Sequence, residues 1–315
     1  MNSFKEIGGY FELESYGAPL YHEGAILLNS GRNALKYIIR AFGIERMYVP
    51  FYTCPVVWEA IREEGCEALF YEIKPDFTPK EDLPEDAFIL VNDYFGVCGS
   101  NIEKLATKHR NLVVDNAQSF YAKPNGVASF YSPRKFFGLP DGGLLICSKK
   151  LDQPIDKDVS HGRMSHLLKR HEYCASEGYD DFVNNDKELS RQPLLEMSSL
   201  TAALMSNINY ESVRKTRCGN FKQLHESLAN KNELKLPEKH VCPQVYPFLL
   251  GKPGIRKRFI DNNIYVAEYW SGVATVTAEG SYSNYLREYL LPLPIDQRYG
   301  VEDMSKILDI LYGSI

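Results

Sequence analysis

Two stretches of sequence decide how this chain folds: Val113-Val-Asp-Asn-Ala-Gln-Ser119 and, after it, Ser129-Phe-Tyr-Ser-Pro-Arg-Lys-Phe-Phe-Gly-Leu-Pro-Asp-Gly-Gly143. An apolar run that ends in a carboxylate, here Asp115, is typical of a buried strand with a polar end. A second apolar run begins at Gly143. Between the two runs lie the amide of Gln118 and the amine of Lys135. We therefore expect a carboxylate, an amide and a lysine at the ends of neighbouring strands.

Short apolar segments alternate with helical patterns through the first half of the chain. One helix period is carried by Leu35, Ile38, Ile39 and Phe42. Asn29 or Ser30 can cap the start of that helix, and Gly43 can end it. Further helices are predicted at 56–63 and 102–109, and strands at 47–50, 68–73, 87–91, 112–115 and 143–147. This alternation predicts an α/β fold with a mainly parallel central sheet and helices on both faces. Ligands in such folds bind beyond the carboxyl ends of the strands.

The second half of the chain begins with a polar excursion over residues 151–196. A helical region follows from Ser198 to Leu228, and further helices are predicted at 256–261 and over the last residues, where Met304, Ile307, Leu308 and Leu311 share one face. Strands are predicted at 245–250, where Pro247 indicates an edge, and at 265–270. We expect a large domain over residues 1–205 and a smaller C-terminal α/β domain over residues 206–315.

The composition limits the class of protein. With 44% hydrophobic and 24% charged residues, the 315-residue chain is ordinary for a globular protein. A net charge of -5 argues against nucleic acid or an anionic membrane as a partner. The chain has no apolar run of the roughly 18 residues that span a bilayer and no signal peptide at its start. Seven cysteines without a CxxC pair, and histidines without ligand spacing, predict neither a disulfide framework nor a metal site. We expect a cytoplasmic location.

Lys135 is the first candidate site residue. A lysine amine forms a reversible imine with an aldehyde, but only in its neutral form. The adjacent aromatic pair Phe136-Phe137 could exclude water and favour that form, and Arg134 would act in the same direction if it pointed inward. The alternative interpretation is a surface lysine in a loop.

Asp115 and Gln118 complete the set that pyridoxal phosphate (PLP) needs. A carboxylate at the end of a strand can keep the pyridine nitrogen protonated, which makes the ring an electron sink. Gln118 could reach the phenolic oxygen of the ring. The alternatives are a turn or capping role for Asp115 and a solvated amide for Gln118. The three residues together predict PLP as the cofactor.

A phosphate site is predicted at the start of the first helix. The segment Asn29-Ser-Gly-Arg-Asn-Ala-Leu35 places small and polar residues where free N–H groups and the helix dipole favour an anion. Either Ser129 or Ser132 could add a hydroxyl, and Ser132 is favoured because both cannot face the side of Lys135. An ordinary capped helix is the alternative.

Six segments in order resemble the DegT/DnrJ/EryC1/StrS family of PLP-dependent sugar aminotransferases. They cover most of the chain: Ser30-Gly-Arg-Asn-Ala-Leu35, Val49-Pro-Phe-Tyr-Thr53, Asp115-Asn-Ala-Gln118, Lys135 with Gly142-Gly143, Met197-Ser-Ser-Leu-Thr-Ala-Ala203 and Leu291-Pro-Leu-Pro294. The resemblance implies the fold type I of PLP-dependent transferases, which is that of aspartate aminotransferase, and a homodimer with active sites at the interface.

The resemblance also implies roles for single residues. Lys135 would carry the Schiff base and move the proton, and Asp115 would pair with the pyridinium. Four residues would bind the phosphate or line its site: Ser30, Gly31, Arg32 and Asn33. Gln118 would lie against the ring, with Cys54 and Ser132 completing the cofactor site. The implied reaction moves an amino group from glutamate to a keto sugar carried on a nucleotide, for surface glycans or related products. Relatives that are dehydratases have histidine in place of Lys135.

The chain departs from the family pattern at three places. Cys54 stands where many relatives have a stacking aromatic residue, and Phe130 stands where they often have serine. Leu194-Leu-Glu196 replaces a common Asn-Tyr-Arg, for which Arg191 could substitute. These departures leave open another PLP reaction on the same fold, such as a lyase, or a PLP-binding regulatory homologue without turnover.

Overall fold

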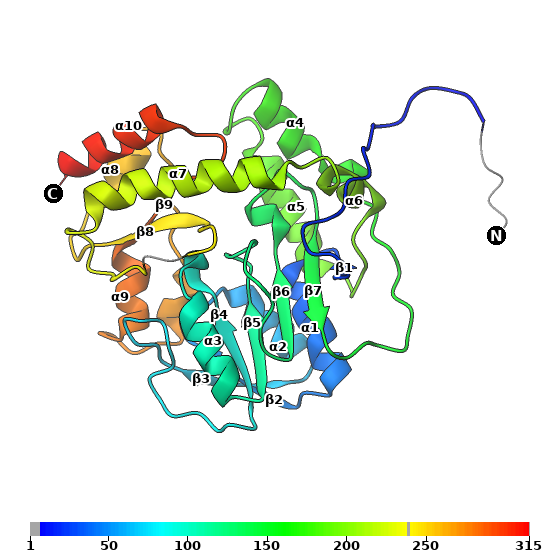
Figure 1. Ribbon diagram of the computed structural model, residues 1–315, viewed down its shortest axis with the longest axis horizontal. Coiled ribbons are helices and arrows are strands. Elements are labelled where there is room, and N and C mark those ends of the chain that lie inside the picture. The colour runs from blue at the N-terminus through cyan, green and yellow to red at the C-terminus, as the bar shows by residue number, and fades with distance from the viewer. Residues whose placement is uncertain (1–6, 238–239, 315) are drawn as a thin grey trace.

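The computed structural model describes residues 7–237 and 240–314, which form two sheets with helices packed around them (Figure 1). The central sheet has seven strands in the order β1-β7-β6-β5-β4-β2-β3. Its strands are β1 (Ile26–Leu28), β2 (Arg46–Pro50), β3 (Glu67–Tyr71), β4 (Phe88–Asn92), β5 (Asn111–Asp115), β6 (Ala128–Tyr131) and β7 (Gly143–Cys147). Strand β7 is antiparallel to both its neighbours, and the pairs from β3 to β6 are parallel. The predicted mainly parallel sheet is confirmed.

Ten α-helices connect and cover the strands of the described residues. They are α1 (Gly31–Phe42), α2 (Pro55–Glu63), α3 (Gly99–Lys108), α4 (Ser165–Glu172), α5 (Tyr179–Arg191), α6 (Ser199–Met205), α7 (Tyr210–Leu228), α8 (Ile255–Asp261), α9 (Tyr282–Tyr289) and α10 (Val301–Tyr312). Ser30 caps α1 through its side chain, and Gly43 ends it in the left-handed conformation that glycine adopts without strain. Both predicted ends of this helix are confirmed.

Alternate residues of the central strands face two separate cores. Leu90 of β4 and Val113 of β5 lie in one hydrophobic cluster with residues of α1 and α2. Val91 and Val114, one residue further along each strand, lie in a second cluster that includes Ile102 of α3. Since successive side chains of a strand point to opposite faces, apolar residues at every position require both faces to be covered. Figure 1 shows the helices on the two sides of the sheet.

The C-terminal part of the chain adds a second sheet. Strand β8 (Val245–Leu249) pairs only with β9 (Leu290–Pro294), in antiparallel register. Pro247 lies opposite Pro292, at a position where neither strand has an N–H to donate. Phe221 and Leu224 of α7 belong to the same hydrophobic cluster as Val114 of the central sheet. The division into two domains between residues 205 and 206 stays a prediction. One hydrophobic cluster contains residues from both sides of this boundary.

Two sequence predictions differ from the structure. Residues 265–270 form no strand; only Val266 among them is buried, and the segment pairs with no neighbouring strand. Alternation alone therefore did not identify a strand, because a strand also needs a partner for its backbone groups. The polar excursion of 151–196 contains α4 and α5, and the helical region after Ser198 is broken between Met205 and Tyr210.

Candidate functional site

The carboxyl ends of β2, β4 and β5 meet at one edge of the central sheet. Cys54 follows β2, and Thr53 accepts a 2.8 Å hydrogen bond at its hydroxyl from the Nδ2 of Asn92 at the end of β4. Asp115 at the end of β5 lies in register with Asn92. After β2 the chain enters α2 on one face of the sheet, whereas after β4 it enters α3 on the other face. In α/β folds ligands bind in a crevice at strand ends where the connections diverge in this way, so the candidate crevice lies at this edge of the sheet.

Asp115 ends β5, and the turn with Lys135 follows the neighbouring parallel strand β6 at the same edge of the sheet. The Asp115 carboxyl is partly exposed, and its Oδ1 accepts a 2.7 Å hydrogen bond from the backbone N–H of Ala117. Burial raises the pKa of this carboxyl, and the Lys135 ammonium opposes that rise. The same ammonium lowers the pKa of the Cys54 thiol, which burial raises. The charge of Lys135 therefore acts on both the Asp115 carboxyl and the Cys54 thiol.

Lys135 is presented on a tight turn. It ends a 3-10 turn formed by residues Pro133–Lys135, in which its backbone N–H donates to the Ser132 carbonyl at 3.1 Å. The side chain of Lys135 is exposed. The rings of Phe136 and Phe137 instead turn into a buried cluster, so the expectation that they exclude water from the amine is wrong. The order of residues on the turn decides this, because consecutive side chains point in different directions.

Arg134 also points away from the amine. Its guanidinium forms an ion pair with Asp186 of α5 at 2.9 Å. Its charge is thus directed to α5 and not to the crevice.

The start of α1 lies beside the lysine turn. The side-chain oxygen of Ser30 accepts a 3.2 Å hydrogen bond from the backbone N–H of Asn33. A Cβ atom on Gly31 would lie 3.7 Å from the Cβ of Ser132, so these two residues are neighbours. A Cβ on Gly143 would come within 2.3 Å of the Ser30 carbonyl, so glycine is needed where β7 passes this helix. The structure thus brings Ser30, Gly31 and Ser132 together.

Arg32 and Asn33 have other partners. Asn33 donates from Nδ2 to the Oδ1 of Asn29 at 2.6 Å and to the Pro193 carbonyl at 2.7 Å, which uses both protons of its amide. Its side chain therefore fastens α1 to the segment after α5. Arg32 lies 3.9 Å from Glu59 of α2. Burial raises the pKa of the Cys54 thiol, and the charge of Arg32 opposes that rise.

Gln118 and Tyr269 both lie next to Phe95, in the turn that follows β4. Gln118 is buried, and its Oε1 accepts a 3.1 Å hydrogen bond from the backbone N–H of Phe95. Burial raises the pKa of Tyr269 to about 12, Cys54 adds to the rise, and the amides of Gln244 and Gln118 oppose it. Tyr269 therefore lies near Cys54 and Gln118, and sequence reasoning did not place it there because its segment was predicted to be a strand. The adjacent aromatic pair Tyr269-Trp270 was the signal available in the sequence.

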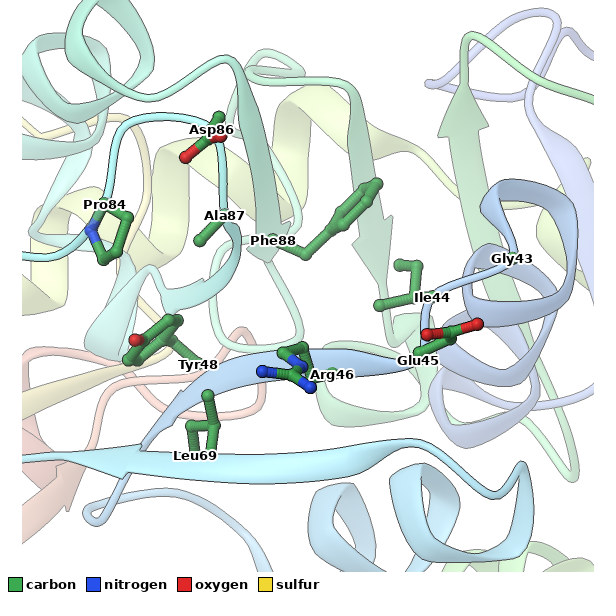
Figure 2. A pocket seen from close by; sticks show the side chains of 10 residues that line it. All are labelled: Gly43, Ile44, Glu45, Arg46, Tyr48, Leu69, Pro84, Asp86, Ala87 and Phe88. Carbon is green, nitrogen blue, oxygen red and sulfur yellow. The ribbon is translucent and has the colours of Figure 1, made fainter.

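A separate hollow lies at the opposite edge of the sheet (Figure 2). It has a volume of about 430 Å³ and is lined by residues at the amino ends of β2 and β4, among them Arg46 and Phe88. Figure 2 shows the side chains of Arg46, Tyr48 and Phe88 around it. Since Asp115 ends its strand, this hollow is not part of the crevice at Asp115 and Lys135.

Residues 7–237 and 240–314 contain neither a grouped set of metal ligands nor a membrane-spanning helix. Within these ranges, no three His, Cys, Asp or Glu side chains are grouped so that they could hold a metal ion. None of the helices in this part of the chain is both long and apolar enough to cross a membrane.

No protein-family model matches the sequence, and no curated protein matches it. Solved structures do resemble the model. A DegT DnrJ EryC1 StrS aminotransferase from Brucella abortus has 18% identity and a TM-score of 0.63 over 93% of this chain and 86% of its own. NtdA from Bacillus subtilis with bound cofactor PMP has 16% identity and a TM-score of 0.64, over 92% and 73%. The sugar aminotransferase CalS13 from Micromonospora echinospora has 11% identity and a TM-score of 0.60, over 92% and 87%. The chain therefore has the fold type I of PLP-dependent transferases, as its sequence predicts.

Proposed function

We propose that this protein is a PLP-dependent aminotransferase of the DegT/DnrJ/EryC1/StrS type that transfers an amino group from glutamate to a keto sugar carried on a nucleotide. The observation that carries the proposal is that Asp115 ends β5 while the turn with Lys135 follows the neighbouring parallel strand β6, at the same edge of the sheet. It is supported by the likeness of the fold to aminotransferases, one of which holds PMP. The sugar class rests on the sequence resemblance and on the likeness to CalS13.

The residues of the crevice fit PLP by their chemistry. When bound, PLP supplies an electron sink for the carbon that gains or loses the amino group. Asp115 leaves one carboxylate oxygen without a backbone partner and can hold a proton on a pyridine nitrogen. Lys135 has an exposed amine that can bind an aldehyde carbon and then move a proton as a general base. The backbone of Gly31 and the hydroxyl of Ser132 lie together and can hold a phosphate.

Covalent capture of PLP by Lys135 tests this proposal. The purified protein should bind PLP with a visible absorption band, and borohydride reduction followed by mass spectrometry should place the cofactor on Lys135. Addition of glutamate should bleach the band. Lys135→Ala should abolish the attachment and keep the circular dichroism spectrum. A protein that takes up no PLP would refute the proposal.

A second function is favoured by the residue at position 54. Cys54 lies in the crevice, where many family members have a stacking aromatic residue, and Phe130 is a buried side chain beside Gly31. A different PLP reaction, or a regulatory PLP-binding protein without turnover, is therefore the alternative. A protein that attaches PLP at Lys135 but whose absorption band no amino donor changes would favour this alternative over transamination.

We also propose that the protein acts as a homodimer in the cytoplasm, on small-molecule substrates and without nucleic acid or membrane partners. Support for the dimer comes from residues 7–25, which precede β1 and of which the first part projects from the body of the molecule in Figure 1. Its side chains Ile7, Tyr10 and Phe11 are 95%, 98% and 98% exposed. Tyr10 and Phe11 are adjacent, and exposed apolar side chains grouped on one segment favour contact with another chain.

A further inference from the structure

The turn that carries Lys135 is held by residues of the C-terminal part of the chain. The carbonyl of Phe136, the next residue, accepts a 2.8 Å hydrogen bond from Nε2 of Gln297. It also accepts a 3.4 Å hydrogen bond from Nη2 of Arg217 on α7. The guanidinium carbon of Arg217 lies 4.6 Å from the centre of the Phe136 ring. Both the backbone and the ring of Phe136 are thus held from more than 80 residues away in sequence.

Arg217 is an unusual residue for a buried position. It is 2% exposed and is among the largest fully buried side chains of the described residues. Its Nε donates to Oε1 of Gln297 at 2.9 Å, and its Nη1 donates to the Gln244 carbonyl at 3.0 Å. All these acceptors are neutral. Burial lowers the pKa of the guanidinium, and the charge of Asp296 opposes that effect.

A buried guanidinium destabilises a fold unless its hydrogen bonds repay the loss of hydration. An apolar side chain of the same length would fill the space without that loss. The five donors of arginine, however, can hold three acceptors in one fixed arrangement, which neither lysine nor an apolar residue can do. The arrangement here joins α7, the segment before β8, the segment after β9 and the lysine turn.

We propose that Arg217 and Gln297 are positioning residues that hold the backbone of Lys135 so that its amine faces Asp115. The proposal rests on the function proposed above. The side chain of Lys135 is exposed, so its place in the crevice depends on its backbone. Arg217 and Gln297 act through the Phe136 carbonyl, one residue from Lys135. Release of that carbonyl would let the turn move and would slow attack of the amine on an aldehyde.

Two variants test the clamp formed by these residues. Arg217→Met keeps the length of the side chain and removes its donors, and Gln297→Leu removes the shorter hydrogen bond while Arg217 stays. Each should slow the attachment of PLP to Lys135, tenfold or more for Arg217→Met and about threefold for Gln297→Leu. Hydrogen–deuterium exchange of the protein without PLP should become faster over residues 132–137 in both. Arg217→Lys should recover only part of the attachment rate.

Arg298→Met is the matched control, because Arg298 donates to Asp296 and not to Phe136. This variant should attach PLP at the wild-type rate. If Arg217→Met does not fold, Gln297→Leu decides the question. Variants with a lowered melting temperature but wild-type exchange at 132–137 and a wild-type attachment rate at every pH would overturn the proposal. Failure of the wild-type protein to attach PLP would refute the proposed function. Faster hydrogen–deuterium exchange in the variants would still show that Arg217 and Gln297 hold the turn.

Discussion

Asp93 is a buried carboxyl next to the candidate site, and its ionisation opposes folding. It lies at the end of β4, where its Oδ1 accepts a 2.8 Å hydrogen bond from the backbone N–H of Cys98. Burial, helped by the charge of Asp115, raises its pKa from 3.8 to about 6. The folded protein therefore holds this proton more tightly than the unfolded chain does. The contribution of this group to the free energy of unfolding is complete below about pH 4 and is lost as the pH rises through 6.

Asp93→Asn should remove this pH dependence, since asparagine keeps an acceptor for Cys98 and does not ionise. The free energy of unfolding of the variant relative to the wild type should rise between pH 4 and pH 7. The rise should be about 1–3 kcal/mol, given about 1.4 kcal/mol for each pH unit of pKa shift. Urea titrations at several pH values measure it.

Asp82→Asn is the control for this measurement. The ion pair with Lys108 lowers the pKa of Asp82, so its stabilisation is present at neutral pH and lost in acid. The Asp82→Asn variant should therefore lose stability relative to the wild type as the pH rises. A difference between Asp93→Asn and the wild type that does not change with pH would contradict the assignment.

At the scale of single elements, α1 combines a structural cap with a proposed anion site. The Ser30 hydroxyl caps α1 through a 3.2 Å bond to the N–H of Asn33. Ser281 caps α9 through a bond of the same length to the N–H of Asn284, outside the crevice. The two helices therefore have the same kind of cap, but only α1 would bind the proposed phosphate.

Ser30→Ala and Ser281→Ala should lose similar stability, about 1 kcal/mol each, because each removes one capping bond. Only Ser30→Ala should also weaken PLP binding, measured by titration of the protein without cofactor, since α1 alone would face the phosphate. Equal PLP affinities in the two variants would place the phosphate away from α1.

At the scale of the whole molecule, the segment before β1 is anchored at one end and exposed at the other. Ser15 and Ser206 share a 2.7 Å hydrogen bond, and the Tyr16 N–H donates to Oδ1 of Asn207 at 2.8 Å. Ile7, Tyr10 and Phe11, which precede this anchor, are exposed to solvent. A second copy of the chain would bury them.

The double variant Tyr10→Ser, Phe11→Ser should weaken the dimer at least tenfold, because it removes the largest exposed apolar area of this segment. Sedimentation velocity over a range of concentrations measures the change. Val301→Ser is the matched control, since Val301 is exposed at 69% on α10, far from this segment in sequence. A wild-type protein that is monomeric at all concentrations would contradict the proposed homodimer.

The sequence by itself determined the class of the fold and the position of its polar edge. Continuous apolar runs along β4 and β5 show that these strands are covered on both faces, and Asp115 ends the apolar run of β5. Ser30 and Gly43 could be assigned as helix ends because capping depends on neighbours within four residues. These features are local, so their chemistry can be deduced from the order of residues.

The tertiary structure alone decided which distant residues complete the crevice. Tyr269 approaches Cys54 and Gln118 because the segment after α8 packs on the central core, and Arg217 reaches Phe136 because α7 does the same. Asn33, although placed at the predicted phosphate site, uses its amide to hold Pro193. Such contacts depend on how two packed layers meet. Residues 81 to 215 positions apart in sequence have no local pattern from which their contact could be predicted.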